Sequence, residues 1–188
     1  IQNLDSADCV ILSDYGQGVV YDSGVERIAK HAKELNIPII ADPKLTGLHR
    51  THDVDWIIFQ SRGFELMKRR IGESDDSLAA ESLINSYGWK HLVVLAGGNG
   101  VTIYSKSEDT VHAPCTLPQL RQVIGLIDAA VVAIAVSISN GLGVSDTALL
   151  TNAACECIMS GTQNFTLTSD DLANRLGEVA WSLQISQR

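Results

Sequence analysis

The sequence predicts an α/β domain built on a mostly parallel sheet with helices on both faces. Two observations support this fold class. Short apolar segments of strand length alternate with segments of helical periodicity through the first half of the chain. Polar or glycine-containing clusters follow these apolar segments, which is typical of loops at the carboxyl ends of parallel strands. With 188 residues, 45% of them hydrophobic, the chain is large enough for one domain with a substantial core.

The first half of the chain is predicted to alternate strands and helices. Ala7–Ser13 is a short apolar run bounded by polar residues, and it predicts a buried strand. Ser23–Leu35 places its apolar residues on one face of a helix. Further strands are predicted at 37–41, 56–59 and 91–95, with helices at 64–71 and 77–87. Strands joined through helices make right-handed crossovers, so we expect these four strands to be parallel.

The second half begins with a predicted β-hairpin and continues as helices. Val101–Ser105 and Thr110–Ala113 are short alternating segments separated by a polar turn at 106–109. Helices are predicted at 127–139, 146–159 and 169–176. No internal repeat, low-complexity segment or linker divides the chain, so a single domain is predicted over residues 1–188.

Composition excludes several classes of function. The formal charge of −8 argues against broad binding to nucleic acid or to an anionic membrane. The longest apolar run, Ala129–Ile138, is about half the length that a membrane span requires. The four cysteines and five histidines have no metal-ligand spacing, so no metal site is predicted. Free thiols indicate a reducing compartment, either the cytoplasm or an organelle matrix.

The segment Gln122–Ala130 has the pattern of an anion-binding turn at the start of a helix. Gly125 permits a tight turn, and the N–H groups of a helix start attract an anion. A carboxylate at such a turn, here Asp128, can accept the proton of a sugar hydroxyl that attacks phosphorus. Leu126 and Ile127 occupy positions where close approach favours small residues. Asp128 is therefore either a catalytic base or a carboxylate that stabilises the helix dipole.

Five segments in order resemble motifs of the ribokinase-like (PfkB) carbohydrate kinases, and within them the heptose-7-phosphate kinase domain of ADP-heptose synthesis. They are Ser13–Gly18, Ile39–Lys44, Ala96–Gly100, Gly125–Asp128 and Asn152–Cys155. The resemblance extends from the first residue to about Thr168 and covers the later two-thirds of such a domain. It implies a ribokinase-like three-layer fold truncated at the N-terminus, with a protein partner covering the missing part.

The resemblance also implies roles for individual residues. Asp128 would be the catalytic base, and an active enzyme would use ATP and Mg²⁺. Nucleotide-binding residues would be Gly97, Gly100, Gly125 and Asn152, and residues for the sugar or its phosphate would be Asp14, Asp42 and Lys44. Simpler explanations remain open: a capped turn at Asp14, a strand end with a solvated lysine at 42–44, a glycine turn at 97–100, and a packed helix residue at Asn152.

Several positions depart from the family pattern. Gln60 and Gly63 stand where the family has an Asn and a Glu that organise magnesium, and Glu65 is the nearest replacement for the lost carboxylate. Leu95 replaces a Thr that donates to phosphate. In the anion turn, Gln122, Ile124 and Ile127 replace an Asp, a Thr and a Gly, and Ile127 is expected to direct a branched side chain toward the anion.

These losses together favour a kinase homologue with impaired catalysis that acts as a structural or assembly subunit, in an oligomer or complex. Two alternatives remain. One is an active ATP-dependent sugar kinase that transfers the γ-phosphoryl group to a sugar such as a heptose 7-phosphate, with Asp128 as base. The other is a regulatory domain that binds a nucleotide or a sugar phosphate without transfer.

Overall fold

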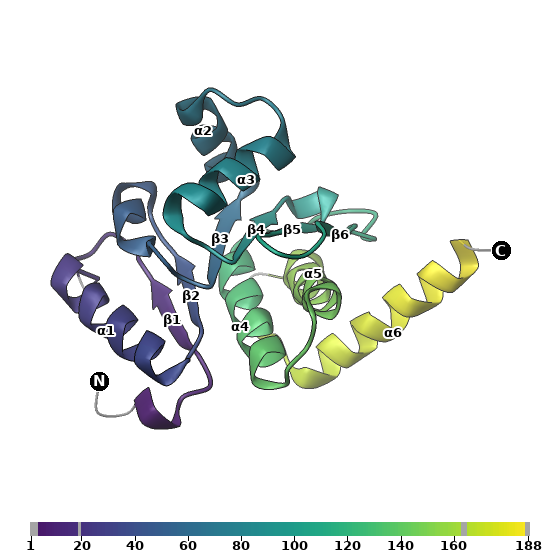
Figure 1. The fold of residues 1–188 in the computed structure, drawn as a ribbon. Helices are drawn as coiled ribbons and strands as arrows, with labels where there is room; N and C mark the ends of the chain where they lie inside the picture. The colour runs from purple at the N-terminus through teal and green to yellow at the C-terminus, as the bar shows by residue number, and fades with distance from the viewer. Residues whose placement is uncertain (1–3, 19, 163–164, 187–188) are drawn as a thin grey trace.

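The computed structural model describes residues 4–18, 20–162 and 165–186, and its centre is one sheet of six strands in sequence order (Figure 1). The first four strands are parallel, and the last two join by antiparallel pairing. They are β1 (Val10–Ser13), β2 (Ile39–Asp42), β3 (Trp56–Gln60), β4 (His91–Leu95), β5 (Val101–Ser105) and β6 (Val111–Ala113). The predicted mostly parallel sheet and the predicted hairpin are both confirmed.

Helices cover both faces of the sheet (Figure 1). One face carries α1 (Asp22–Leu35), α2 (Ser61–Ile71) and α3 (Asp76–Tyr87), and the other carries α4 (Leu126–Ser139) and α5 (Val144–Ser160). The last helix, α6 (Ser169–Ser186), begins against α5 and extends away from the sheet (Figure 1). Within the described residues, no helix has the length and apolar character needed to cross a membrane.

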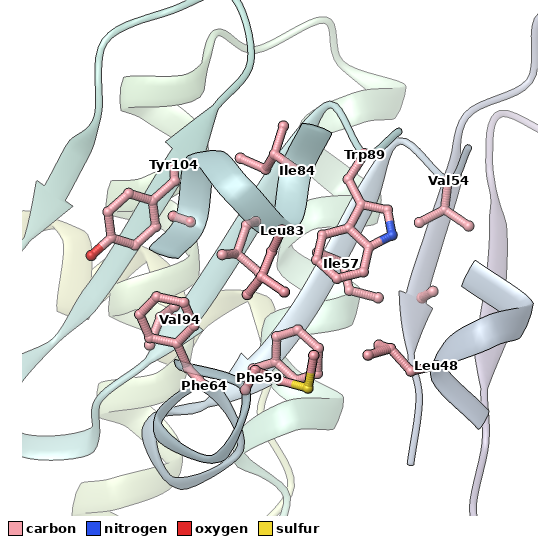
Figure 2. Packing of buried hydrophobic residues seen from close by; sticks show 14 of the residues in the cluster. Leu48, Val54, Ile57, Phe59, Phe64, Leu83, Ile84, Trp89, Val94 and Tyr104 are labelled. Atoms are coloured by element: carbon pink, nitrogen blue, oxygen red, sulfur yellow. The ribbon is translucent and has the colours of Figure 1, made fainter. Parts of the chain in front are cut away.

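The strands alternate their side chains between two hydrophobic cores. Ile57 and Phe59 of β3 point into the core under α2 and α3, whereas Trp56 and Ile58 join the core under α4 and α5. Figure 2 shows the first core, in which Trp89 is fully buried between β3 and the helices. The indole N–H of Trp89 donates to the carbonyl oxygen of Thr51 at 2.7 Å. A buried donor without that acceptor would be costly.

Some boundaries differ from those predicted. The first strand is shorter than the predicted Ala7–Ser13 segment, and η1 (Leu4–Ser6) lies ahead of it. A 3₁₀ helix, η2 (Leu45–Thr51), follows β2, and a short one, η3 (Gly97–Asn99), lies between β4 and β5. The helix α6 continues ten residues past the predicted end at Leu176, because Gly177 weakens a helix without necessarily ending it.

Candidate functional site

The residues predicted to bind the sugar and the predicted catalytic base converge at one edge of the sheet. Asp14 directly follows β1 and Asp42 ends β2, and these parallel strands place the two residues side by side, with the N–H of Asp14 donating to the carbonyl oxygen of Asp42 at 3.0 Å. The start of α4 reaches the same edge, because the Tyr15 hydroxyl donates to Oδ1 of Asp128 at 2.9 Å. The structure therefore brings Asp14, Asp42 and Asp128 together, as expected from their positions after strands and at a helix start.

Asp14 is buried and holds the turn after β1 in place. Its Oδ1 accepts the backbone N–H of Gly16 at 2.8 Å, and its Oδ2 pairs with the guanidinium of Arg50 at 3.2 Å. Arg50 also pairs with Asp22 at the start of α1, at 2.6 Å. Since both oxygens of Asp14 have partners, the observed contacts match the capped-turn explanation. A direct role for Asp14 in sugar binding stays a prediction.

Asp42 has the environment of a carboxylate that retains protons more readily than usual. Burial raises its pKa most strongly, and the nearby negative charges of Asp128 and Asp14 raise it further. The hydroxyl of Ser13, which donates to Oδ2 at 3.4 Å, and the charge of Lys44 act in the opposite direction. Lys44 is exposed, and its stem passes close to Gly16. Asp42 and Lys44 thus lie together at the sheet edge.

The turn before α4 retains one feature of an anion-binding turn and changes another. Gly125 has φ 83°, a left-handed conformation that suits glycine, and Asp128 is exposed in the first turn of the helix. That Ile127 directs its side chain toward an anion stays a prediction. Ile127 does not adopt positive φ, and its partly buried side chain packs against the core under α4 and α5. Leu126 is buried in the same core.

The loop expected to face nucleotide phosphates lies next to the segment before α4. A Cβ atom on Gly98 would lie 3.3 Å from the Leu120 side chain. Gly97 and Gly100 both have positive φ, at 56° and 89°. Leu95, at the end of β4, is only 2% exposed and belongs to the core. Gly97 and Gly100 thus lie in the loop between β4 and β5, and their role in nucleotide binding stays a prediction. Leu95, which stands where the family pattern has a threonine, does not face solvent.

No protein-family model matches the chain, but individual relatives do. Over 176 residues it is 27% identical to the bifunctional protein HldE of Aeromonas salmonicida and 25% identical to HldE of Aliivibrio fischeri. These alignments cover 93% of this chain and 37% of each relative.

The fold matches solved kinases. Phosphofructokinase-2 from Escherichia coli in complex with fructose-6-phosphate superposes with a TM-score of 0.74 at 17% identity, over 95% of this chain and 59% of that one. Ribokinase from Thermotoga maritima superposes with a TM-score of 0.73 at 21% identity, over 94% of this chain and 59% of that one. The chain has the ribokinase-like fold.

The residues at the positions where the family pattern has magnesium-organising side chains make other contacts in this chain. Gln60 is exposed at the end of β3, and Gly63 lies in the first turn of α2 beside the Phe59 ring. Glu65, the nearest candidate to replace the lost carboxylate, pairs with Lys68 at 3.1 Å. Among the residues that the structure describes, no group of three His, Cys, Asp or Glu side chains could hold a metal ion.

Asn152 lies inside the ribokinase-like domain and is 2% exposed. Its side-chain N–H donates to the carbonyl oxygen of Pro114 at 3.0 Å, which fixes the strand end after β6 against α5. Its Oδ1 and the hydroxyl oxygen of Thr151 have no hydrogen-bond partner in the described part of the chain. The packed-residue explanation accounts for the observed contact, and nucleotide binding by Asn152 stays a prediction.

Sequence reasoning missed Tyr15. A carboxylate after a strand is a familiar chemical signal and points to Asp14, whereas a tyrosine beside glycines is also typical of an ordinary turn. The contact between Tyr15 and Asp128 joins residues 113 positions apart, so it depends on the sheet and α4 being assembled. An aromatic residue within the polar loop Asp14–Gly18 was the available clue.

Proposed function

We propose that this chain is a sugar-kinase homologue in which phosphoryl transfer is impaired, and that it acts as a structural part of a larger assembly. Its acceptor side, the sheet edge at which a sugar would bind, still presents the carboxyl groups of Asp128 and Asp42, which suit the hydroxyl groups of a sugar. Its phosphate side has lost donors that the family pattern contains. The observation that carries the proposal is this difference between the sugar side, which keeps its carboxyl groups, and the phosphate side, which has lost its donors.

The phosphate side does not fit Mg²⁺ and ATP well. Ile124, at a threonine position of the family pattern, is 78% exposed and has no hydroxyl to offer. Leu95 is buried and apolar. The amide of Gln122, at an aspartate position of the family pattern, donates to the carbonyl oxygen of Thr162 at 2.7 Å. One missing donor to a developing anion typically costs about 3–4 kcal/mol of transition-state stabilisation, so several losses would suppress turnover strongly.

A coupled assay of ADP release tests impaired transfer. With ATP, Mg²⁺ and either fructose 6-phosphate or heptose 7-phosphate, we expect no turnover above the level of the Asp128→Asn variant, because the phosphate-side donors are absent. The variant is a suitable control since Asp128 is exposed and its replacement keeps the size of the side chain. Turnover that Asp128→Asn abolishes would contradict the proposal.

Such a result would favour the second candidate, an active ATP-dependent sugar kinase. One specific observation supports that candidate. The side chain of Ile127 is partly buried and packs against the core under α4 and α5. The backbone N–H groups at a helix start remain suited to an anion even when side-chain donors are lost.

The assembly role is supported by the edge of the sheet at β1. In the described residues β1 pairs only with β2, and Ile11 on this edge strand is 44% exposed. An open edge with apolar side chains is a template for pairing with another strand. We therefore propose that a protein partner or a second copy covers β1.

Light scattering tests this surface. We expect a mass above the 20.2 kDa of one chain, and we expect Ile11→Glu to lower it, because a charge on the edge disfavours strand pairing. Leu78→Glu is the matched control, since Leu78 is 55% exposed on α3. A wild-type protein that remains a monomer at all concentrations, and that binds no added partner, would contradict the assembly role.

A further inference from the structure

The contact between Tyr15 and Asp128 is too specific for an incidental surface contact. The tyrosine is 61% exposed, so burial of its ring does not explain where the side chain lies. Its hydroxyl nevertheless donates to Oδ1 of Asp128 at 2.9 Å. This hydrogen bond connects the turn after β1 with the first turn of α4. We propose that Tyr15 is a positioning residue that holds one oxygen of Asp128 and leaves the other oriented toward the hydroxyl of an acceptor. This inference rests on the proposed acceptor site.

The turn that carries Tyr15 is braced on its other side. Asp14 accepts the N–H of Gly16 and pairs with Arg50, and Arg50 pairs in turn with Asp22. Gly16 has φ 72°, a conformation that glycine adopts without strain. The turn that carries the phenol is thus fixed to η2 and α1. A side chain can orient another one only if its own backbone is held in place.

The electrostatics of the edge explain why a neutral donor suits this position. Asp42 and Asp128 are close enough for the charge of Asp128 to contribute, after burial, to the raised pKa of Asp42. A phenol stabilises the carboxylate by hydrogen bonding without pairing it with a cation. The phenol occupies one oxygen of Asp128 and leaves the other for the acceptor hydroxyl, whereas a lysine at this position would form an ion pair with the carboxylate.

The test compares Tyr15→Phe with Tyr21→Phe. Tyr21 is similarly exposed, at 57%, and its ring lies against Gly24 at the start of α1, away from the contact with Asp128. Two measurements are made on the whole chain: the ¹³Cγ resonance of the Asp128 carboxyl group by NMR, and the affinity for fructose 6-phosphate by calorimetry. Both variants keep the aromatic ring, so we expect their melting temperatures to equal that of the wild type. Measuring the melting temperature checks that folding is unchanged.

We expect Tyr15→Phe to move the Asp128 ¹³Cγ resonance and to weaken fructose 6-phosphate binding about tenfold, because an Asp128 side chain that is no longer held loses its hydrogen bond with the acceptor hydroxyl. Tyr21→Phe should change neither. An unmoved resonance, or a moved resonance with unchanged affinity, overturns the positioning role. If the wild-type chain does not bind fructose 6-phosphate, both the acceptor site and the positioning role are overturned. In that case, an Asp128 resonance that moves in Tyr15→Phe would show that the hydrogen bond exists but does not position Asp128 for an acceptor.

Discussion

Arg175→Ala should lower the free energy of unfolding by about 3–5 kcal/mol, the range found when one partner of a buried ion pair is removed. Glu156 on α5 is fully buried, and Nε of Arg175 on α6 donates to its Oε2 at 2.6 Å. The arginine side chain is 15% exposed, so water compensates part of the loss. Denaturation in urea, followed by circular dichroism, measures the change.

The exposed partner of the same arginine provides the control. Glu178 pairs with Arg175 at 2.6 Å, three residues along α6, but its side chain is 67% exposed. Glu178→Ala should therefore cost about 0.5 kcal/mol or less. Adding Glu156→Gln to Arg175→Ala should restore part of the stability, because it removes the uncompensated buried charge. Equal losses from Arg175→Ala and Glu178→Ala would show that burial of Glu156 does not matter.

The same ion pair connects α6 with the segment that leads into α4. Glu156 also accepts the backbone N–H of Thr116, and the guanidinium of Arg175 donates to the Thr116 hydroxyl at 2.5 Å. Thr116 precedes the turn at Gly125 on the same connecting segment between β6 and α4. We therefore expect amide exchange in residues 114–125 to accelerate in Arg175→Ala, which hydrogen-exchange mass spectrometry would detect.

The strands were predictable from the sequence because their apolar runs are short and bounded by polar residues. Trp56–Phe59 and His91–Leu95 lie within β3 and β4 almost to the residue. The 3₁₀ helix η2 was not predicted, since Leu45–Thr51 is only seven residues long and offers two apolar side chains, Leu45 and Leu48. Only the assembled fold shows that Leu48 within it is 2% exposed.

The candidate site was predictable in composition and only partly in geometry. Asp14, Asp42 and Asp128 were selected because carboxylates after strands and at a helix start meet at one edge of a parallel sheet. The packing of the Ile127 side chain against the core was not predictable, because it depends on how α4 rotates against the sheet. The contact of Tyr15 with Asp128 was missed for the same reason: it joins two elements whose relative placement is set by packing.

Gly100→Ala should lower the free energy of unfolding by about 3–5 kcal/mol, from overpacking and from a left-handed conformation together. A Cβ atom there would lie 2.1 Å from the carbonyl oxygen of Ala113 and 2.7 Å from the backbone nitrogen of Cys115. Both are backbone atoms and cannot rotate away. The residue also has φ 89°, which alanine disfavours. The close passage of the chain after β6 therefore requires glycine at this position, whether or not a phosphate binds.

Gly97→Ala is the matched comparison in the same loop. Gly97 has φ 56°, but a Cβ atom there would meet nothing within 4 Å, so the expected cost is about 1 kcal/mol. Thermal denaturation of both variants separates the two effects, because only Gly100→Ala adds a backbone clash to the conformational cost. If both variants melted together, the approach of residues 113–115 to Gly100 would not constrain the loop, and contact with a phosphate would be the better reason for this glycine. If Gly100→Ala melts at a much lower temperature than Gly97→Ala, the packing of residues 113–115 is the reason for glycine at position 100. Gly97 is then the glycine whose substitution tests nucleotide binding.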